Sequence, residues 1–306
     1  MKKINYHTHT YRCGHAAGDE KDMIESAIHL GIEELGFSEH VPLSHYRFHL
    51  LSSIPYHRSL RSIKAMIIAF IKNGPDMRLK YRDIHEHLSL LNEYKKEYKD
   101  QIKIYKGFEA EGYKAYFKYY QKLLDDNIVD YLILGHHFHK YSIHDDYIGK
   151  KNTTKKDLYI YAKDIEEALE TNMFTYLAHP DLFFLDYKHF DEDTKKVSEI
   201  ICKAAKKHNI PLEINAGGIR KGYVEVDNED VYLYPNYHFW QIASKIGNDV
   251  IIGFDAHHPD DFNQNMYDQL LEFAKKYNLN VIDKLQFLKG KNIFIINKKI
   301  NKNLLK

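Results

Sequence analysis

Short apolar segments alternate with amphipathic helical segments along most of the chain, and this alternation restricts the possible fold more than any other feature. Buried strands are expected at residues 4–7, 32–37, 102–108, 131–134, 175–178, 211–214 and 250–253. Helical periodicity follows them at 21–30, 82–99, 115–125, 155–171, 194–208, 237–246 and 261–277. Seven such units with short connections predict an α/β fold with a parallel sheet, and they favour a closed barrel over an open sheet.

A single domain is the simplest organisation for residues 1–306, because no long linker, repeat or low-complexity segment interrupts the alternation. Residues 44–80 exceed a normal connection and carry their own helical periodicity, so we expect an insertion over the mouth of the barrel. Residues 290–306 are expected to be a C-terminal appendage with one further strand.

The charge balance gives no reason to expect a nucleic-acid or membrane partner, since 44 basic residues face 43 acidic ones. No apolar run approaches the roughly 18 residues that a membrane span needs, and the first residues do not resemble a secretion signal. Cys13 and Cys202 lie far apart in the sequence. We therefore expect a cytoplasmic protein with free thiols and a small-molecule substrate, and the oligomeric state stays open.

Histidines or carboxylates follow every predicted strand. These residues are His7, His9, His40, Glu109, Glu111, His136, His137, His179, Glu213, Asp255 and His257. In a parallel barrel all strand ends share one face, and alternate residues such as His7 and His9 point the same way. A lone histidine at a strand end is more often structural. However, seven such ends are hard to attribute to packing, because unpaired polar groups beside a core cost free energy.

This mixture of imidazoles and a few carboxylates suits zinc, iron or manganese better than calcium or magnesium. One ion cannot use so many ligands, so two or three divalent ions with a bridging carboxylate are expected. His85 and His87 repeat the spacing of His7 and His9, but they fall in a predicted helix. Side chains two residues apart diverge there by roughly 200°, and we expect both on a solvated face.

The ordered motifs resemble the polymerase and histidinol phosphatase (PHP) family, and within it the stand-alone histidinol-phosphate phosphatases. The motifs are His7-Thr8-His9, Cys13-Gly14-His15-Ala16, Gly36-Phe37-Ser38-Glu39-His40, Gly107-Phe108-Glu109, Ala178-His179-Pro180 and Asp255-Ala256-His257. The resemblance implies a distorted seven-stranded (β/α)7 TIM-like barrel that holds a trinuclear metal centre.

The resemblance also implies the ligands of each ion. His7, His9, Glu109 and Asp255 would hold the first ion, Glu109, His137 and His179 the second, and His15, His40 and His257 the third. The fourth strand ends one residue earlier than is usual in this branch. Either His136 or His137 could therefore be the ligand, and we prefer His137 because the expected aromatic residue follows it. Glu111 replaces the commoner aspartate and is given no role.

The run from Glu213 to Lys221 resembles the E-x-N…G-x-R-K motif of the phosphatase branch, in which the arginine, here Arg220, binds the substrate phosphate. The implied reaction is hydrolysis of L-histidinol phosphate to L-histidinol and phosphate, a step of histidine biosynthesis, by attack of a metal-bound hydroxide. Asp255 or a nearby histidine would protonate the leaving oxygen. Asp181, Glu213 and His45 are the candidate contacts for the rest of the substrate.

Three alternatives stay open. A PHP phosphoesterase could act on another small phosphate ester or on a nucleotide diester. Asp191-Glu192-Asp193 fits the D-x-D pattern of phosphatases with an aspartyl nucleophile, although no apolar strand precedes it, and acidic residues at the start of a helix are the better interpretation. The chain could also be a metal-binding protein without activity.

Overall fold

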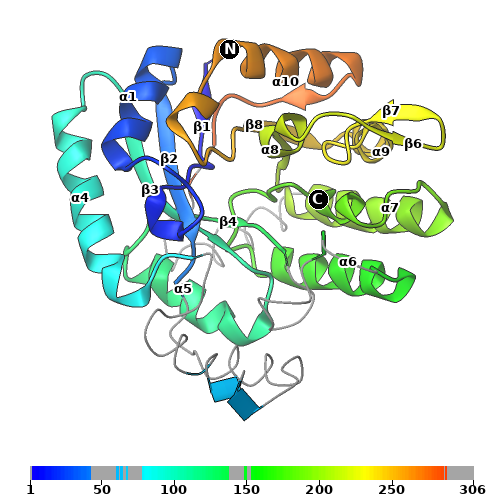
Figure 1. Cartoon of the computed structure of the whole chain (residues 1–306), viewed down its shortest axis with the longest axis horizontal. Coiled ribbons are helices and arrows are strands. Elements are labelled where there is room, and N and C mark those ends of the chain that lie inside the picture. Colours follow the sequence, from blue (N-terminus) through cyan, green and yellow to red (C-terminus); the bar gives the residue numbers. More distant parts are fainter. Residues whose placement is uncertain are drawn as a thin grey trace, which may run out of the picture.

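The computed structural model describes residues 2–42, 60–61, 63–64, 67, 78–137, 148–149, 153–285 and 287. Two groups of parallel strands form its centre (Figure 1). The first group contains β1 (Ile4–Asn5), β2 (Glu34–His40), β3 (Lys103–Ala110) and β4 (Tyr131–Leu134), hydrogen-bonded in that order. The second contains β5 (Leu212–Asn215), β8 (Asp249–Gly253) and β9 (Asn280–Val281).

Isolated bridges join the two groups into one curled parallel sheet. Leu177 pairs with Leu134 on one side and with Leu212 on the other, and Thr8 pairs with Ala256. The strand expected at 175–178 is therefore reduced to one bridged residue, whereas the other six expected strands are present. The backbone of His179 has φ of 28°, so the chain leaves the extended conformation directly after this bridge.

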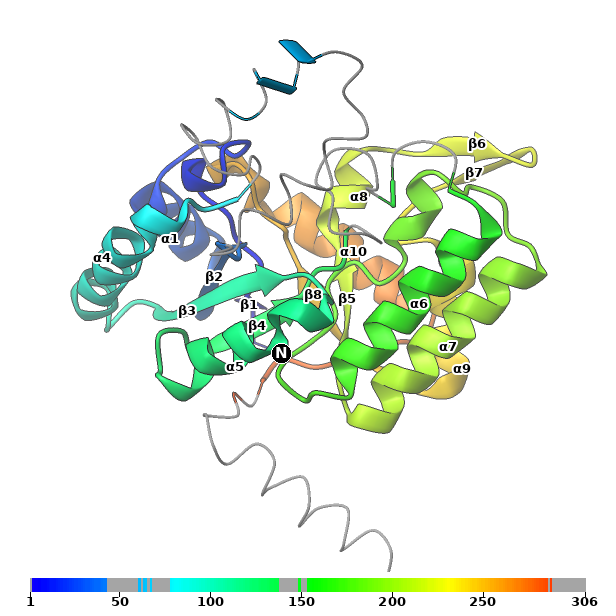
Figure 2. The ribbon, with the colours of Figure 1, turned by 90° about the horizontal axis from the view of Figure 1, so that it is seen from below.

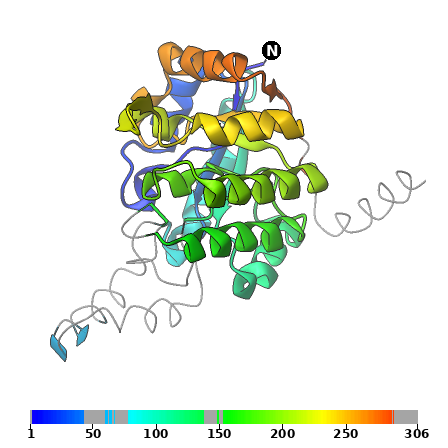
Figure 3. The ribbon, with the colours of Figure 1, turned by 90° about the vertical axis from the view of Figure 1, so that its right-hand side faces the viewer.

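Helices surround the outside of the sheet (Figure 1). They are α1 (Glu20–Leu30), α4 (Ile84–Glu97), α5 (Phe117–Asp125), α6 (Lys155–Leu169), α7 (Glu192–His208), α9 (Tyr237–Ile246) and α10 (Gln264–Lys276). Figure 3 shows α10, α9, α7 and α6 stacked side by side in that order. None of the described helices is both long enough and apolar enough to cross a lipid bilayer.

Shorter elements lie between these helices. The helix α8 (Ala216–Arg220) follows β5, and the antiparallel hairpin of β6 (Val224–Val226) and β7 (Glu229–Val231) comes next. The 3-10 turns are η1 (Tyr11–Cys13), η3 (Tyr81–Asp83), η4 (Lys114–Tyr116), η5 (Leu182–Leu185) and η6 (Pro259–Asp261). The N-terminus and the β6–β7 hairpin lie on opposite sides of the sheet (Figure 2).

Side-chain caps explain where several helices begin. In α7, the Asp191 carboxylate accepts hydrogen bonds from the backbone N–H groups of Asp193 and Thr194, at 3.0 and 2.9 Å. Such a cap satisfies donors that the first helical turn leaves free. The interpretation of Asp191-Glu192-Asp193 as a helix start is therefore confirmed, and the aspartyl-nucleophile alternative has no structural support.

An apolar cluster fills the inside of the curled sheet. It contains Ile4, Tyr6, Tyr131, Ile133, Tyr176, Ala178 and Ile251. The Tyr131 hydroxyl donates to the backbone carbonyls of Tyr6 and Phe37, at 2.7 and 3.0 Å. A Cβ at Gly36 or Gly107 would overlap the Tyr131 side chain. These residues come before the polar strand ends in the sequence, so the cluster closes the amino-terminal side and leaves the carboxyl ends for polar groups.

Two expected segments cannot be compared with the structure. Most of the insertion at 44–80, including His45, lies outside the described residues, and so does the appendage at 290–306.

Candidate metal centre

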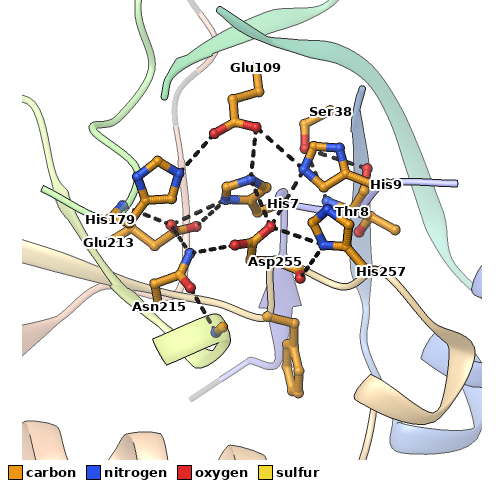
Figure 4. Close-up of polar contacts among 12 residues, drawn as sticks. His7, Thr8, His9, Ser38, Glu109, His179, Glu213, Asn215, Asp255 and His257 are labelled. Carbon is orange, nitrogen blue, oxygen red and sulfur yellow. Dashed lines mark hydrogen bonds and ion pairs between the residues drawn. The ribbon is translucent and has the colours of Figure 1, made fainter. Parts of the chain in front are cut away.

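Glu109, near the end of β3, contacts several of the converging imidazoles, among them His179, His7 and His9 (Figure 4). Its two carboxylate oxygens face different imidazoles. Oε1 lies 2.9 Å from His179 Nε2 and 3.4 Å from His137 Nε2. Oε2 lies 3.0 Å from His40 Nδ1 and 3.4 Å from Nε2 of both His7 and His9. This is the arrangement of a carboxylate that could bridge two cations.

Asp255 joins this group because the chain beyond β8 runs beside the chain beyond β1. His9 N–H donates to the Ala256 carbonyl at 2.9 Å, and Ala256 N–H donates to the His7 carbonyl at 3.2 Å. Asp255 Oδ1 therefore lies 3.3 Å from His7 Nε2 and 3.5 Å from His9 Nε2. The φ of Asp255 is 48°. Left-handed backbone outside glycine is concentrated at functional sites.

His15 and His257 meet at the exposed edge of the same group, which we call the outer pair. Their Nε2 atoms are 2.9 Å apart. His15 Nδ1 lies 3.2 Å from the Cys13 carbonyl, and His257 Nδ1 lies 3.0 Å from the Asp255 carbonyl. A carbonyl accepts only from a protonated ring nitrogen, so each Nε2 carries a lone pair. Two lone pairs that face each other at this distance fit a shared cation.

Several buried polar atoms of the site have no hydrogen-bond partner in the protein. They are His7 Nε2, His9 Nδ1, His9 Nε2, Glu109 Oε2 and His179 Nδ1. Leaving such atoms unpaired costs free energy, and metal coordination would satisfy those that face the centre. Donor atoms within 4.8 Å of one another occur in His7, His9 and Asp255, in His7, Glu109 and His179, and in His9, His40 and His257. This mixed nitrogen and oxygen donor set fits zinc, iron or manganese.

Glu213 lies behind His7 and is fully buried (Figure 4). Its Oε1 is 2.9 Å from His7 Nδ1, and its Oε2 accepts from the His179 backbone N–H at 3.1 Å and from Asn215 Nδ2 at 2.7 Å. A Cβ at Gly253 would overlap this carboxylate. Because both oxygens already have partners inside the protein, the geometry favours a role in orienting His7 over the predicted substrate contact.

Glu111, to which the sequence assigned no role, orients His137 in the same way. Its Oε1 lies 2.9 Å from His137 Nδ1, and its Oε2 accepts from the His137 backbone N–H at 2.8 Å. The alternation that pairs His7 with His9 also places Glu111 on the side of Glu109, and this signal could have identified it. His136 points elsewhere, with Nε2 3.4 Å from Asp164 Oδ2. The geometry favours His137 over His136 as the candidate ligand.

Burial and neighbouring charges set the protonation of the group when no cation is present. Burial lowers the pKa of His7 and His9, but the surrounding carboxylates outweigh it and raise both well above the usual value. Burial raises the pKa of Glu109 and Asp255, yet nearby imidazoles hold both well below the usual range. Protonated histidines thus compensate ionised carboxylates, and a bound cation would replace those protons.

Arg220 binds backbone rather than lying free. Its two terminal nitrogens donate to the carbonyls of Phe254 and Asp255, at 2.8 and 2.7 Å, and its Nε is 3.4 Å from Asp261 Oδ1. Asp261 Oδ2 accepts from the backbone N–H groups of His257 and His258, at 2.8 and 3.0 Å. Arg220 and Asp261 together hold the turn that carries Asp255 and His257.

Asp181 does not contact the group of imidazoles. It is buried, and its Oδ2 accepts from the Asn236 backbone N–H at 2.6 Å and from Trp240 Nε1 at 3.1 Å. Burial raises the pKa of Asp181 to about 7. Its position fits a structural role in joining η5 to α9, so its candidacy as a substrate contact is not supported.

His87 corrects the expectation that both histidines of α4 are solvated. His85 is exposed, but His87 is fully buried, with Nδ1 2.7 Å from Glu20 Oε1. The same Glu20 oxygen accepts from Arg12 Nε at 2.7 Å. His87 therefore faces the start of α1 rather than solvent, a contact between distant segments that helical periodicity alone does not reveal.

Known proteins that are similar to this chain belong to the family that its motifs resemble. The model of the PHP domain matches residues 5–217. A Deinococcus radiodurans protein named probable histidinol-phosphatase is 22% identical over 270 residues, covering 87% of this chain and 90% of that protein.

Two solved structures share the fold. The histidinol phosphate phosphatase of Lactococcus lactis, complexed with zinc, L-histidinol and phosphate, has a TM-score of 0.65 at 18% identity, covering 94% of this chain and 98% of that one. A candidate histidinol phosphatase of Listeria monocytogenes has a TM-score of 0.64 at 20% identity, covering 87% of this chain and 99% of that one.

Proposed function

Since this chain belongs to the PHP domain family, we propose that it is a metal-dependent phosphomonoesterase that hydrolyses L-histidinol phosphate to L-histidinol and phosphate. The observation that carries the proposal is the position of Glu109, whose two oxygens face two different groups of imidazoles. The reaction fits a relative named as a histidinol-phosphatase and a related structure that holds zinc, L-histidinol and phosphate.

The metal ligands proposed for this chain are those that the family resemblance implies, and the close approach of their side chains supports them. His7, His9, Glu109 and Asp255 would hold one ion, Glu109, His137 and His179 a second, and His15, His40 and His257 a third. Bound divalent ions would neutralise phosphate charge and lower the pKa of water toward neutrality. We also propose that the curled sheet is a distorted seven-stranded barrel, with Leu177 in the position of its fifth strand and Thr8–Ala256 as the closing contact.

The remaining roles belong to the protein's own side chains. Asp255 is ionised and beside the cluster, so it can take a proton from the attacking water and deliver it to the ester oxygen that leaves phosphorus. Arg220 donates to two backbone carbonyls beside the cluster, and the further N–H donors of its guanidinium can bind phosphate oxygens. Glu213 and Glu111 hold His7 and His137 in the ring orientation that coordination needs.

Phosphate release from L-histidinol phosphate by the purified chain, with metal content measured on the same preparation, tests the proposal. We expect activity that is lost on exhaustive chelation and restored by zinc. The kcat/KM for L-histidinol phosphate should exceed that for p-nitrophenyl phosphate. Equal kcat/KM values for the two esters would contradict L-histidinol phosphate as the specific substrate, but they would leave the proposed phosphomonoesterase reaction standing. Cleavage of a nucleotide diester in place of the monoester would favour the alternative PHP activity.

A matched pair of variants makes the test specific. His179→Asn removes a nitrogen that faces Glu109, whereas His189→Asn removes an exposed histidine that pairs only with Asp227. We expect the first to lose activity and metal together, and the second to keep both. No phosphate release from any ester by fully metal-loaded protein would instead support a binding protein without activity.

We propose a reducing cytoplasm as the location, in keeping with two cysteines that are both buried and unpaired.

A further inference from the structure

Cys13 lies next to the outer pair, although nothing above gives it a role. It ends η1, and Gly14 follows with φ of 83°, so the chain reverses and brings the His15 ring back over Cys13. The Cys13 side chain is fully buried, and its Sγ lies 4.0 Å from His15 Nε2.

Three donor atoms from Cys13, His15 and His257 lie within 4.8 Å of one another. Around a tetrahedral zinc ion, with bonds of about 2.0–2.3 Å, ligand atoms lie roughly 3.3–3.6 Å apart. The separations of 2.9 Å between the two Nε2 atoms and 4.0 Å from sulfur to nitrogen lie on either side of this range. Small side-chain rotations would bring all three atoms to one ion.

The surroundings of Cys13 also suit a coordinated sulfur. Donor atoms of His9 and Glu39 lie within 4.8 Å of the Cys13 sulfur. His9 Nδ1 and Glu39 Oε2 lie 3.8 Å from each other, and among the described residues neither atom has a hydrogen-bond partner. The thiol thus lies beside further buried donor atoms, as expected near a cation.

We propose that Cys13 Sγ is a ligand of the outer ion, together with His15 and His257, and that this thiolate makes the outer position selective for zinc or iron(II) over manganese or magnesium. Soft sulfur ligands favour these metals, while magnesium and manganese prefer oxygen. Because the metal ligand is the thiolate, the S–H bond breaks when the S–metal bond forms, and one proton is released to solvent.

The inference rests on the proposed metal centre and adds a ligand and a selectivity to it. It can be tested by spectroscopy on the full chain after its resident ions are replaced with Co²⁺. Cobalt bound by imidazole and carboxylate absorbs in the visible, and cobalt bound by thiolate adds a charge-transfer band in the near ultraviolet. The two bands separate the metal centre from the sulfur ligand.

The chain offers a matched control, since Cys202 is its only other cysteine and is also buried. The Cys202→Ser variant contains a single thiol, so any charge-transfer band in it must come from Cys13. We expect this variant and the unchanged chain to show the band, and Cys13→Ser to lose it together with about one equivalent of bound zinc. The Cys202→Ser spectrum is decisive even if Cys13→Ser does not fold.

Visible cobalt bands without a near-ultraviolet band in Cys202→Ser would overturn the sulfur ligand and leave the proposed function intact. A band that persists in folded Cys13→Ser would overturn it as well. Absence of all cobalt bands would overturn both the sulfur ligand and the metal centre.

Discussion

The inner and outer parts of the site hold their imidazoles in different ways. In the inner part, His7 and His137 are buried, and carboxylates from Glu213 and Glu111 contact their second ring nitrogens. In the outer pair, backbone carbonyls contact the second nitrogens of His15 and His257, and His15 is exposed. A carboxylate partner makes an imidazole a stronger ligand than a carbonyl partner does. We therefore expect the inner ions to bind tightly and the outer ion to exchange.

The largest effect is expected from Glu109→Gln. The substitution removes the charge that both sets of imidazoles share, so kcat/KM on L-histidinol phosphate should fall by at least about 10³-fold, the scale of losing a main source of transition-state charge stabilisation. Metal content should fall in the same preparation. Glu199→Gln on α7, which removes an exposed carboxylate paired with Lys203, is the control. If Glu109→Gln kept full metal content and full activity, the proposal that Glu109 bridges two metal ions would be contradicted.

Glu213→Gln should have a smaller effect that is confined to the inner part. Loss of an orienting carboxylate typically costs about 10–100-fold in metal affinity or activity. Competition with a chromophoric chelator should therefore show weaker inner binding and unchanged binding of the outer ion. If KM alone rises while metal affinity stays the same, Glu213 is a substrate contact after all.

Arg220→Gln should raise KM and the inhibition constant of inorganic phosphate by about tenfold, the low end for losing a charge-assisted hydrogen bond. Asp261→Asn should act through the same turn and weaken the outer ion. Because the two residues contact each other, the effects in the double variant should not add. Lys245→Gln, an exposed cation on α9, should change neither quantity. Additive effects would mean that the two residues act independently.

The smallest effect is a change in melting temperature with pH. In metal-free protein, neighbouring carboxylates raise the pKa of His7 and His9. Protonation of these histidines therefore stabilises the fold fully below about pH 6.5, the usual pKa of an unfolded histidine. This stabilisation is lost as the pH rises through the higher pKa values of the folded protein. We expect the metal-free protein to melt a few degrees lower at pH 9 than at pH 7, by scanning calorimetry.

The two parts of the site should differ here as well. Burial lowers the pKa of His257 to about 4, so this residue is neutral across the same range. His257→Asn should keep the pH dependence of the metal-free protein, and zinc loading should abolish it. A metal-free protein with the same melting temperature at both pH values would contradict the assigned charges.

The sequence was most informative where chemistry repeats along the chain. Strand periodicity with His or a carboxylate at each carboxyl end was enough to predict an α/β fold with a parallel sheet and the meeting of His7, Glu109, His179 and Asp255, whereas the closed seven-stranded barrel stays a prediction. The left-handed backbone of His179 and Asp255 could not be predicted, because it depends on contacts between strands distant in sequence. The partners of Glu213 and His87 could not be predicted for the same reason. Glu213 contacts His7, 206 residues away in the sequence, and His87 contacts Glu20, 67 residues away.

The packing of Tyr131 against Gly36 and Gly107 in the apolar cluster has a consequence for turnover. Within the described part of the chain this packing closes the amino-terminal side of the sheet, so ester, water, alcohol and phosphate would all pass the carboxyl ends of the strands. Phosphate is the product that bound cations would attract most strongly, and bound phosphate would occupy the place of the next ester. Release of phosphate would then limit the turnover rate, and added phosphate would be a competitive inhibitor.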